Sequence, residues 1–112
     1  MEVIRERWFA DELANGTHKV GDLTDIHYEE LVEIFGQPTY SEESFDGKIQ
    51  VEWVIELEDK YFTIYDWKVF NREYTLNQLL TWSIGGLTDP SELKLYIYKN
   101  LNKIRKQRLL NS

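Results

Sequence analysis

The chain has 112 residues and a formal net charge of −7, and 14% of its residues are aromatic, including four Trp and seven Tyr. This length fits one domain, and the apolar content is too high for a disordered acidic chain. The absence of cysteine excludes disulfides, thiolate metal sites and cysteine nucleophiles, and only His18 and His27 could supply an imidazole. Composition therefore favours a folded binding domain over an enzyme.

The charge is unevenly distributed along the chain. Residues 1–67 hold 17 acidic side chains against 5 basic ones, and residues 68–112 hold 3 against 8. This asymmetry can indicate an interaction surface, although a solvated acidic face followed by a basic helix end explains it equally well. The chain has no apolar run long enough to span a bilayer, and residues 1–13 do not resemble a signal peptide. We therefore expect a cytoplasmic protein that does not contact a membrane.

The first segment, residues 2–16, has two interpretations. Ile4, Trp8 and Leu13 recur at near-helical spacing, and Asn15-Gly16 is a plausible left-handed stop, which predicts a helix. The alternation within residues 3–9 also fits a short edge strand.

A second helix is predicted from about Ile26 to Phe35. Thr24 or Asp25 is the expected N-cap, and the helix should end at Gly36, before Pro38. Its core-facing side is defined by i, i+3, i+4, i+7 spacing and comprises Tyr28, Leu31, Val32 and Phe35.

Residues 49–57 alternate between apolar and polar side chains, which is typical of a strand. A turn at residues 58–60 leads into residues 61–67, which are rich in aromatic and β-branched side chains, so the two runs predict an antiparallel hairpin. One face carries Ile49, Val51, Trp53, Ile55 and Leu57, and the other carries Gln50, Glu52, Glu56 and Glu58. We expect helices to cover only the apolar face.

The remaining third of the chain is predicted to end in a long helix. Residues 68–80 fit either a strand or a short helix capped by Thr75, and residues 81–84 fit a short strand ended by Gly85-Gly86. The last helix starts with a capping box of Asp89 and Glu92 around Pro90, and its apolar stripe comprises Leu93, Ile97, Leu101 and Ile104.

The predicted fold is thus a single α+β domain over residues 1–112. A small antiparallel sheet is built on a central hairpin of about residues 49–57 and 61–67, and it packs against N-terminal helices and a long C-terminal helix.

Catalytic and metal sites have weak support in the sequence. Glu52 and Glu56 could form an acid–base pair, but like charges on a solvated strand are far commoner. His27 and Glu30 are too few to define a metal site. Gly85-Gly86 resembles a phosphate cradle, but Asp89 would repel the phosphate and the lysine of a phosphate-binding loop is missing. We predict no catalytic residue, metal or cofactor.

Three groups of side chains are candidate binding residues. The acidic group could copy the phosphate charges of a nucleic acid. The aromatic group lies near one end of the predicted sheet, where exposed Trp and Tyr would be contact residues, although core packing is the alternative for each. The basic group lies on the last helix, where complementation of the helix dipole explains it equally well. The groups are Glu29, Glu30, Glu33, Glu52 and Glu56; Tyr65, Trp67 and Trp82; and Lys99, Lys103 and Lys106.

Four segments, in this order, resemble a group of small uncharacterised bacteriophage proteins: LVEIFGQPTYS (31–41), DGKIQVEWVIELED (46–59), FTIYDWK (62–68) and WSIGG (82–86). The stretch that they span, residues 31–86, is half of the chain. The resemblance implies a phage or prophage accessory gene and brings no catalytic residues with it. This chain has Ser83 where similar proteins lead us to expect histidine, which further argues against catalysis there.

The leading functional hypothesis is therefore a phage-encoded acidic protein that binds a host protein, such as a nuclease or another defence component, and inhibits or modulates it. Because residues 1–67 would repel a nucleic-acid backbone, we expect a protein partner and not DNA or RNA. Two alternatives stay open. One is sequestration of a nucleotide signal, with aromatic side chains stacking on the base and Lys68, Arg72 or the basic helix holding phosphates. The other is a structural or assembly role in which the last helix packs against a second copy or another virion protein.

Overall fold

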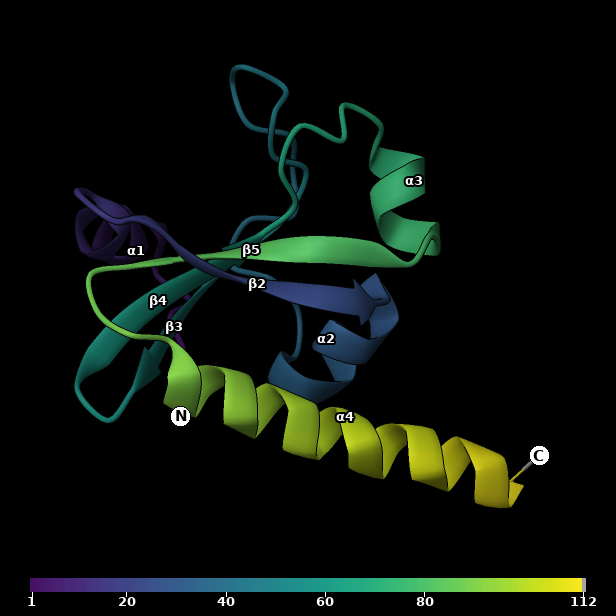
Figure 1. Cartoon of the computed structure of the whole chain (residues 1–112). Helices are drawn as coiled ribbons and strands as arrows, with labels where there is room; N and C mark the ends of the chain where they lie inside the picture. Colours follow the sequence, from purple (N-terminus) through teal and green to yellow (C-terminus); the bar gives the residue numbers. More distant parts are fainter. Residues whose placement is uncertain (112) are drawn as a thin grey trace.

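The computed structural model describes residues 1–111, which form a five-stranded antiparallel sheet flanked by helices (Figure 1). The strands are β1 (Glu2–Val3), β2 (His18–Ile26), β3 (Glu52–Leu57), β4 (Lys60–Tyr65) and β5 (Leu80–Gly86), in the spatial order β1-β3-β4-β5-β2. The helices are α1 (Arg7–Ala14), α2 (Tyr28–Phe35), α3 (Arg72–Asn77) and α4 (Ser91–Asn111). This arrangement confirms the predicted α+β class, the central hairpin and the long C-terminal helix.

The central hairpin of β3 and β4 is shorter than predicted. Leu57 pairs with Lys60, and the two residues between them, Glu58 and Asp59, have φ of 50° and 64°. Two residues with positive φ suit the tight turn whose twist matches that of paired strands. The regular ladder begins at Glu52 because the N–H groups just before it donate to the side chain of Asp66 instead.

Strand β5 contains Gly85 and Gly86, so the prediction that these glycines end the strand is wrong. Both residues pair with β4 and β2. A Cβ at Gly85 would come within 2.5 Å of Thr63 Oγ1, and one at Gly86 within 2.9 Å of Phe62 Cδ1. The two glycines therefore make room for side chains of the neighbouring strand.

Strand β2 was not predicted. It is an edge strand whose register shifts between Leu23 and Ile26, so its two fully buried side chains lie three residues apart instead of alternating. The N–H of Thr24 donates to the hydroxyl of Tyr98 at 3.2 Å, and Arg105 Nη2 donates to the carbonyl of Asp25 at 2.6 Å. Helix α4 thus runs beside this edge and protects it from pairing with another chain.

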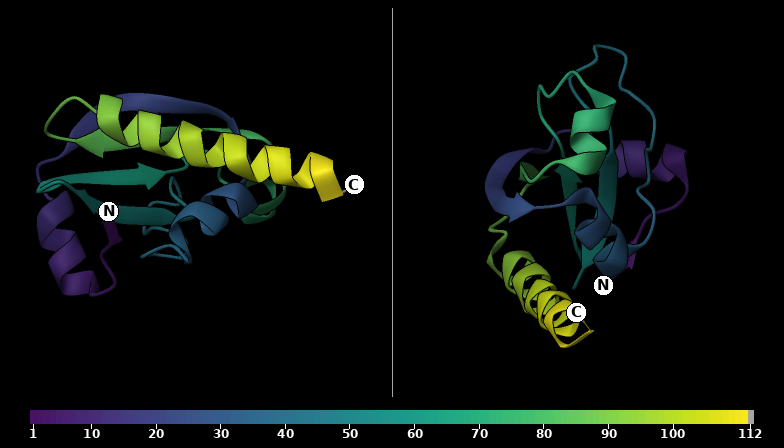
Figure 2. Two further views of the ribbon diagram at one scale, coloured as in Figure 1. Left: turned by 90° about the horizontal axis from the view of Figure 1, so that it is seen from below. Right: turned by 90° about the vertical axis from the view of Figure 1, so that its right-hand side faces the viewer.

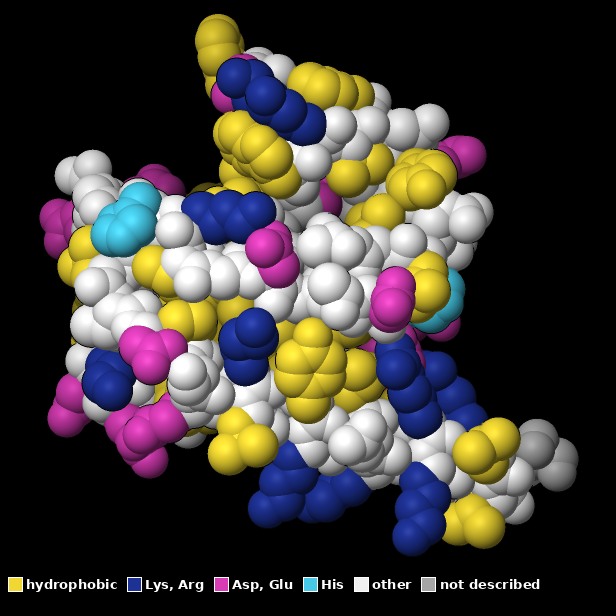
Figure 3. All heavy atoms as spheres, in the orientation of Figure 1, with side chains coloured by type: hydrophobic (Ala, Val, Ile, Leu, Met, Phe, Trp, Pro, Cys, Tyr) yellow, Lys and Arg dark blue, Asp and Glu magenta, His cyan; other side chains and the backbone are white. Residues whose placement is uncertain are grey.

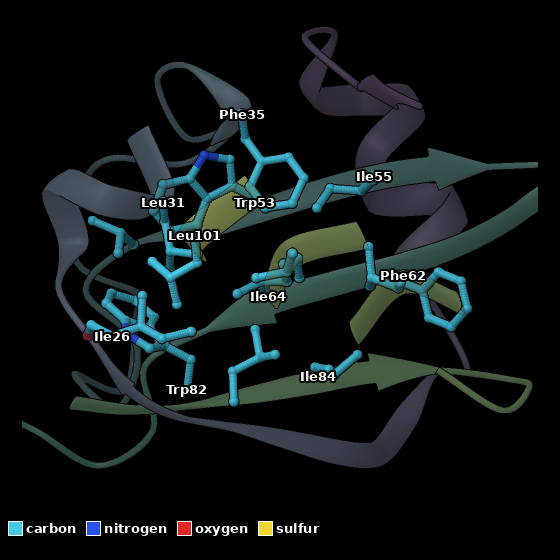
Figure 4. Packing of buried hydrophobic residues seen from close by; sticks show 14 of the residues in the cluster. Ile26, Leu31, Phe35, Trp53, Ile55, Phe62, Ile64, Trp82, Ile84 and Leu101 are labelled. Carbon is cyan, nitrogen blue, oxygen red and sulfur yellow. Dashed lines mark hydrogen bonds between the residues drawn. The ribbon is translucent and has the colours of Figure 1, made fainter. Parts of the chain in front are cut away.

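The core lies between the sheet and helices α2 and α4 (Figure 4). The rings of Trp53 and Trp82 meet edge to face at 5.8 Å between centroids. Each indole N–H is satisfied: Trp53 donates to the carbonyl of Gly36 at 3.0 Å, and Trp82 donates to the carbonyl of Ile26 at 2.9 Å. The predicted core position of Trp53 is therefore confirmed.

The opposite face of the sheet is also partly covered, which corrects the expectation of a wholly exposed acidic face. Helix α1 contacts β3 and β4 and lies on the other side of the sheet from α4 (Figure 2). Tyr40 forms a two-bond bridge with Glu52, in which each N–H donates to the other residue's carbonyl at 2.9 Å. Consequently, Val54 on this face is fully buried.

The N-terminal segment contains both structures that its sequence allowed. β1 pairs with β3, and α1 begins only at Arg7. Trp8 lies on α1 and is 66% exposed.

Helix α2 begins at Tyr28, two residues later than predicted. The expected caps Thr24 and Asp25 are wrong, because both lie in β2. His27 is the N-cap residue, and its backbone N–H donates to the carboxylate of Glu30 at 2.9 Å. The helix ends at Gly36, as predicted.

Helix α3 settles the ambiguity of residues 68–80 in favour of a short helix, followed by β5. Its N-cap is Asn71, whose side chain accepts the N–H of Tyr74 at 3.1 Å, so the prediction of Thr75 as the cap is wrong. Asp89 accepts the N–H of Ser91 at 3.0 Å, as expected of a residue that caps this end of α4, but the helix begins at Ser91 and not at Pro90 as predicted. The predicted apolar stripe of α4 is confirmed for Leu93, Ile97 and Leu101, which are buried.

Candidate binding site

Two loops lie together at one end of the molecule, where they project beside α3 (Figure 1). The first, residues 41–51, precedes β3, and the second, residues 66–71, follows β4. Their backbones are joined by a hydrogen bond from the N–H of Lys68 to the carbonyl of Lys48 at 2.7 Å, and Arg72 Nη1 of α3 donates to the carbonyl of Gln50 in the first loop at 3.0 Å. The two loops therefore form one surface.

The side chain of Asp66 anchors both loops to the sheet and to α3. It is fully buried, and its Oδ1 accepts the N–H groups of Gln50 at 2.7 Å and Val51 at 3.0 Å. Its Oδ2 accepts the hydroxyl of Thr75 at 2.8 Å. A buried carboxylate with three donors is strongly held, because leaving any of them unpaired costs free energy. Asp66 thus fixes the backbone of the residue next to it, Trp67.

The loops present large apolar side chains to solvent. Trp67 is 47% exposed and Phe70 is 61% exposed, and Phe45 is fully exposed at the tip of the first loop. Hydrophobic and basic side chains gather over this end of the molecule (Figure 3). We call this surface the aromatic platform and define it as Phe45, Lys48, Trp67, Lys68 and Phe70.

Two lysines flank the indole of Trp67. The ammonium groups of Lys48 and Lys68 each lie 5.7 Å from its ring centroid, within the range of a cation–π interaction. The ring of Tyr65 meets Trp67 edge to face at 6.1 Å. These contacts restrict the indole, so a binding partner would meet a largely ordered aromatic side chain.

The backbone of the second loop is strained. Lys68 has φ of 57° and Phe70 has φ of 59°, a conformation that side chains other than glycine rarely adopt. Each such residue costs on the order of 1 kcal/mol and persists only where the surroundings enforce it. Here the enforcing contacts are those of Asp66 and Arg72, and the strained residues are the ones displayed to solvent.

The structure separates the three aromatic residues that the sequence suggested. Trp67 is exposed and Tyr65 is half-buried at the same end of the sheet, which agrees with a contact role. Trp82 is wrong as a contact residue, because it is fully buried in the core and its indole N–H is bonded inside the protein. Phe45, Lys48 and Phe70 were missed, since single residues in polar loops have no periodic pattern that indicates exposure.

The five predicted acidic residues do not form one surface. Glu29 and Glu33 are exposed on α2, whereas Glu52 and Glu56 lie on β3 and are half-buried. Glu30 is 1% exposed and is wrong as a surface residue.

Glu30 instead fastens α4 to α2. Its Oε2 and Oε1 accept hydrogen bonds from Arg105 at 2.9 and 3.1 Å, and Oε2 also accepts one from Arg108 at 3.1 Å. Burial raises the pKa of Glu30, but the hydrogen bond from Arg105, the bond from the His27 N–H and the two guanidinium charges outweigh it, so the pKa is lowered overall. Glu30 is therefore a structural residue.

Glu52 lines a cleft beneath α1. The cleft has a volume of about 660 Å³, and its acidic and aromatic lining comprises Asp11, Glu12, Tyr40, Glu42, Glu43 and Glu52. Burial, followed by the charges of Asp11 and Asp66, raises the pKa of Glu52 to about 7. Its carboxyl group is consequently about half protonated at neutral pH and is a poor member of an anionic recognition surface.

The predicted basic residues of α4 are exposed, as a contact role requires: Lys99, Lys103 and Lys106 all face solvent. The neighbouring arginines differ, because Arg105 and Arg108 are engaged by Glu30. Basic side chains also line the far part of α4 in Figure 3.

Within residues 1–111, no group of three or more His, Asp or Glu side chains is placed to hold a metal ion. In the same part of the chain, no helix is long and apolar enough to cross a membrane. Comparisons with protein-family models, curated proteins and solved structures find no match to this chain.

Proposed function

We propose that this chain acts by binding another protein, with the aromatic platform as its contact surface. The observation that carries the proposal is the exposed indole of Trp67, held beside two lysines on loops that a buried carboxylate anchors. Trp is the residue most enriched among those that dominate binding energy, and truncating one at a binding hot spot costs about 2 kcal/mol or more.

The construction of the platform supports binding. Its two loops are joined to each other and to α3, so little additional order has to be imposed when a partner docks. Its aromatic side chains Phe45, Trp67 and Phe70 are all exposed, and aromatic side chains are enriched at the centre of protein interfaces.

The charge of the chain favours a protein partner. The formal net charge is −7, and residues 1–67 contain 17 acidic side chains against 5 basic ones. Binding to DNA or RNA depends on neutralising several phosphates, and this acidic body would oppose it. A protein partner imposes no such requirement.

The resemblance of four segments to bacteriophage proteins supports a finer version of the proposal. In that version the chain is a phage accessory protein in the host cytoplasm that inhibits or modulates a host protein, without catalysing a reaction. Acidic mimicry of a nucleic acid would now involve residues near α1, because Glu30 is neutralised and Glu52 is half protonated.

Affinity capture tests the proposal. Bacterial lysate is passed over the immobilised wild-type chain, over Trp67→Ala/Phe70→Ala and over Trp8→Ala, and the retained proteins are identified by mass spectrometry. Trp8 is the matched control, because it is an exposed Trp on α1.

We expect a protein that the wild type and Trp8→Ala retain and the platform variant loses. Equal retention by all three chains, with circular dichroism showing that each is folded, would remove the platform as the contact surface.

A further inference from the structure

Resting on the proposed function, we infer that the segment of the partner that docks on the aromatic platform is acidic and apolar: carboxylates reach Lys48 and Lys68 while an aromatic or aliphatic side chain packs on Trp67 and Phe70. The juxtaposition of two ammonium groups, neither in an ion pair within the described residues, with exposed apolar rings carries this inference.

Neither lysine forms an ion pair within residues 1–111. The carboxylate near Lys48 in sequence is Asp46, which accepts the N–H of Lys48 at 3.1 Å and the hydroxyl of Ser44 at 2.8 Å and feels the Lys48 charge without a direct ion pair. The carboxylate near Lys68 in sequence is Asp66, which is buried and bonded to Gln50, Val51 and Thr75. Both ammonium groups are therefore available to an incoming anion.

The position of the two lysines beside Trp67 indicates that the anion belongs to a segment that also carries an apolar group. Because each ammonium lies 5.7 Å from the centroid of Trp67, an anion that pairs with it arrives beside the indole. Packing an apolar group there removes water from the ring and strengthens the neighbouring charge pairs. Phe70 lies within the same surface, because its Cδ1 is 3.9 Å from the position that a Cβ on Gly47 would occupy. Glu43 Oε1 lies 2.9 Å from that position, so an incoming carboxylate must approach the lysines from the side away from Glu43.

A nucleotide could bind the same three side chains: its phosphate would pair with Lys48 and Lys68, and its base would stack on the indole of Trp67. Charge decides between the two occupants. A peptide segment brings two or three negative charges to the platform. A nucleic-acid strand carries one at every nucleotide, and its charges beyond the platform would be repelled by the acidic body of the chain. We therefore assign the platform to a protein segment.

Peptide display tests the assignment, because the selection requires no identified partner. A random dodecapeptide library is selected on the full-length chain and counter-selected on Trp67→Ala. We expect enriched peptides in which Asp or Glu lies within a few positions of Trp, Phe or Leu.

The affinity of an enriched peptide is then measured by fluorescence anisotropy. Trp67→Ala should weaken binding about 30-fold or more, as expected for a Trp at the centre of an interface. Lys48→Gln and Lys68→Gln should each weaken it about 2- to 5-fold, with the loss shrinking at high salt. Lys106→Gln, which removes an exposed lysine on α4, is the matched control and should have no effect.

Three results would overturn the inference. Enriched peptides without acidic residues, bound equally by the two lysine variants, would refute the acidic partner and leave the proposed function standing. If the selection yields no peptide whose binding depends on Trp67 and the lysate capture is also negative, both the acidic partner and the proposed function are refuted. A 20-nucleotide dT strand whose binding is lost in Trp67→Ala would assign the platform to nucleic acid, and all variants are confirmed as folded by circular dichroism.

Discussion

Two buried carboxylates, Glu30 and Asp66, hold different elements of this molecule together and are stabilised in different ways. Glu30 accepts hydrogen bonds from two arginines of α4, whereas Asp66 accepts them from two backbone N–H groups and a hydroxyl. The choice of donor determines what remains on the surface. Glu30 occupies the guanidinium groups near it, whereas Asp66 binds no cation among the described residues, in which Lys48 and Lys68 form no ion pair beside Trp67. The surroundings of Glu30 are therefore closed by charge pairing, and those of Asp66 are anchored but carry cations outside any ion pair.

The largest loss of stability should come from removing Asp66, which anchors the loops of the aromatic platform. Asp66→Ala deprives Gln50, Val51 and Thr75 of their acceptor, and unpaired buried donors cost about 1 to 3 kcal/mol each, so we expect a loss of about 4 kcal/mol. Urea denaturation measures it. Asp22→Ala, which removes only a surface ion pair with Lys19, is the control and should cost less than about 0.5 kcal/mol. Equal losses in the two variants would show that Asp66 is not an anchor.

A third carboxyl group, Glu52, is buried without a cation and should destabilise the protein at high pH. Its pKa is raised from 4.5 to about 7 by burial and by the charges of Asp11 and Asp66. The unfolded chain ionises near 4.5 and the folded one near 7, so stability falls as the pH rises through this interval. Glu52→Gln should therefore stabilise the protein by about 3 kcal/mol at pH 8 and have no such effect at pH 4.

Thermal or urea denaturation at the two pH values checks this prediction. Glu56→Gln, on the same strand, is the matched control and should change stability by less than about 0.5 kcal/mol at either pH. A stabilisation by Glu52→Gln that is independent of pH would rule out ionisation as the cause.

The sequence predicted the hairpin because a local rule decides it. Trp53 and Ile55 alternate with polar neighbours, and Glu58-Asp59 fits a tight turn, so no distant contact is needed. Strand β2 was missed because a register shift places its buried Leu23 and Ile26 three residues apart. The prediction that Gly85 ends its strand was wrong for a similar reason, since this glycine makes room for Thr63 of another strand.

The candidate site was predicted only in part, because exposure depends on distant partners. Tyr65 and Trp67 follow a predicted strand, which indicated their place at the end of the sheet. The exposure of Phe45 and Phe70 depends on loops that Asp66 joins across the fold. The burial of Glu30 likewise depends on Arg105, which lies 75 residues further along the chain. No local pattern contains this information.

The packing of α4 against α2 should lose stability when the buried charge of Glu30 is removed. Glu30→Gln removes the carboxylate that accepts hydrogen bonds from Arg105 and Arg108, and Arg108 keeps only its 3.7 Å ion pair with Glu33. Breaking a fully buried pair costs about 3 to 5 kcal/mol. These arginines are 43% and 48% exposed, so water compensates in part and we expect a loss of about 2 kcal/mol at pH 7.

The pH dependence identifies the source of this loss. Because the pKa of Glu30 is lowered in the folded chain, its contribution is present above about pH 4.5 and disappears as the pH falls through the folded value. The difference between Glu30→Gln and the wild type should therefore shrink below about pH 4 in urea denaturation. Glu29→Gln, on the exposed side of the same helix and in no ion pair within the described residues, controls for the change of charge, and an equal loss in both variants would contradict the anchoring role.

The smallest change in stability should come from relieving the backbone strain at Lys68, in the second loop of the aromatic platform. Lys68 has φ of 57°, so Lys68→Gly removes the clash of its Cβ and should stabilise the protein by about 0.5 to 1 kcal/mol. Lys68→Ala keeps the Cβ and is the matched control, expected within about 0.3 kcal/mol of the wild type. Because Lys68→Gly also removes an ammonium from the platform, it should gain stability while it loses affinity for an acidic partner. A gain in both would show that the strain at this loop does not serve binding.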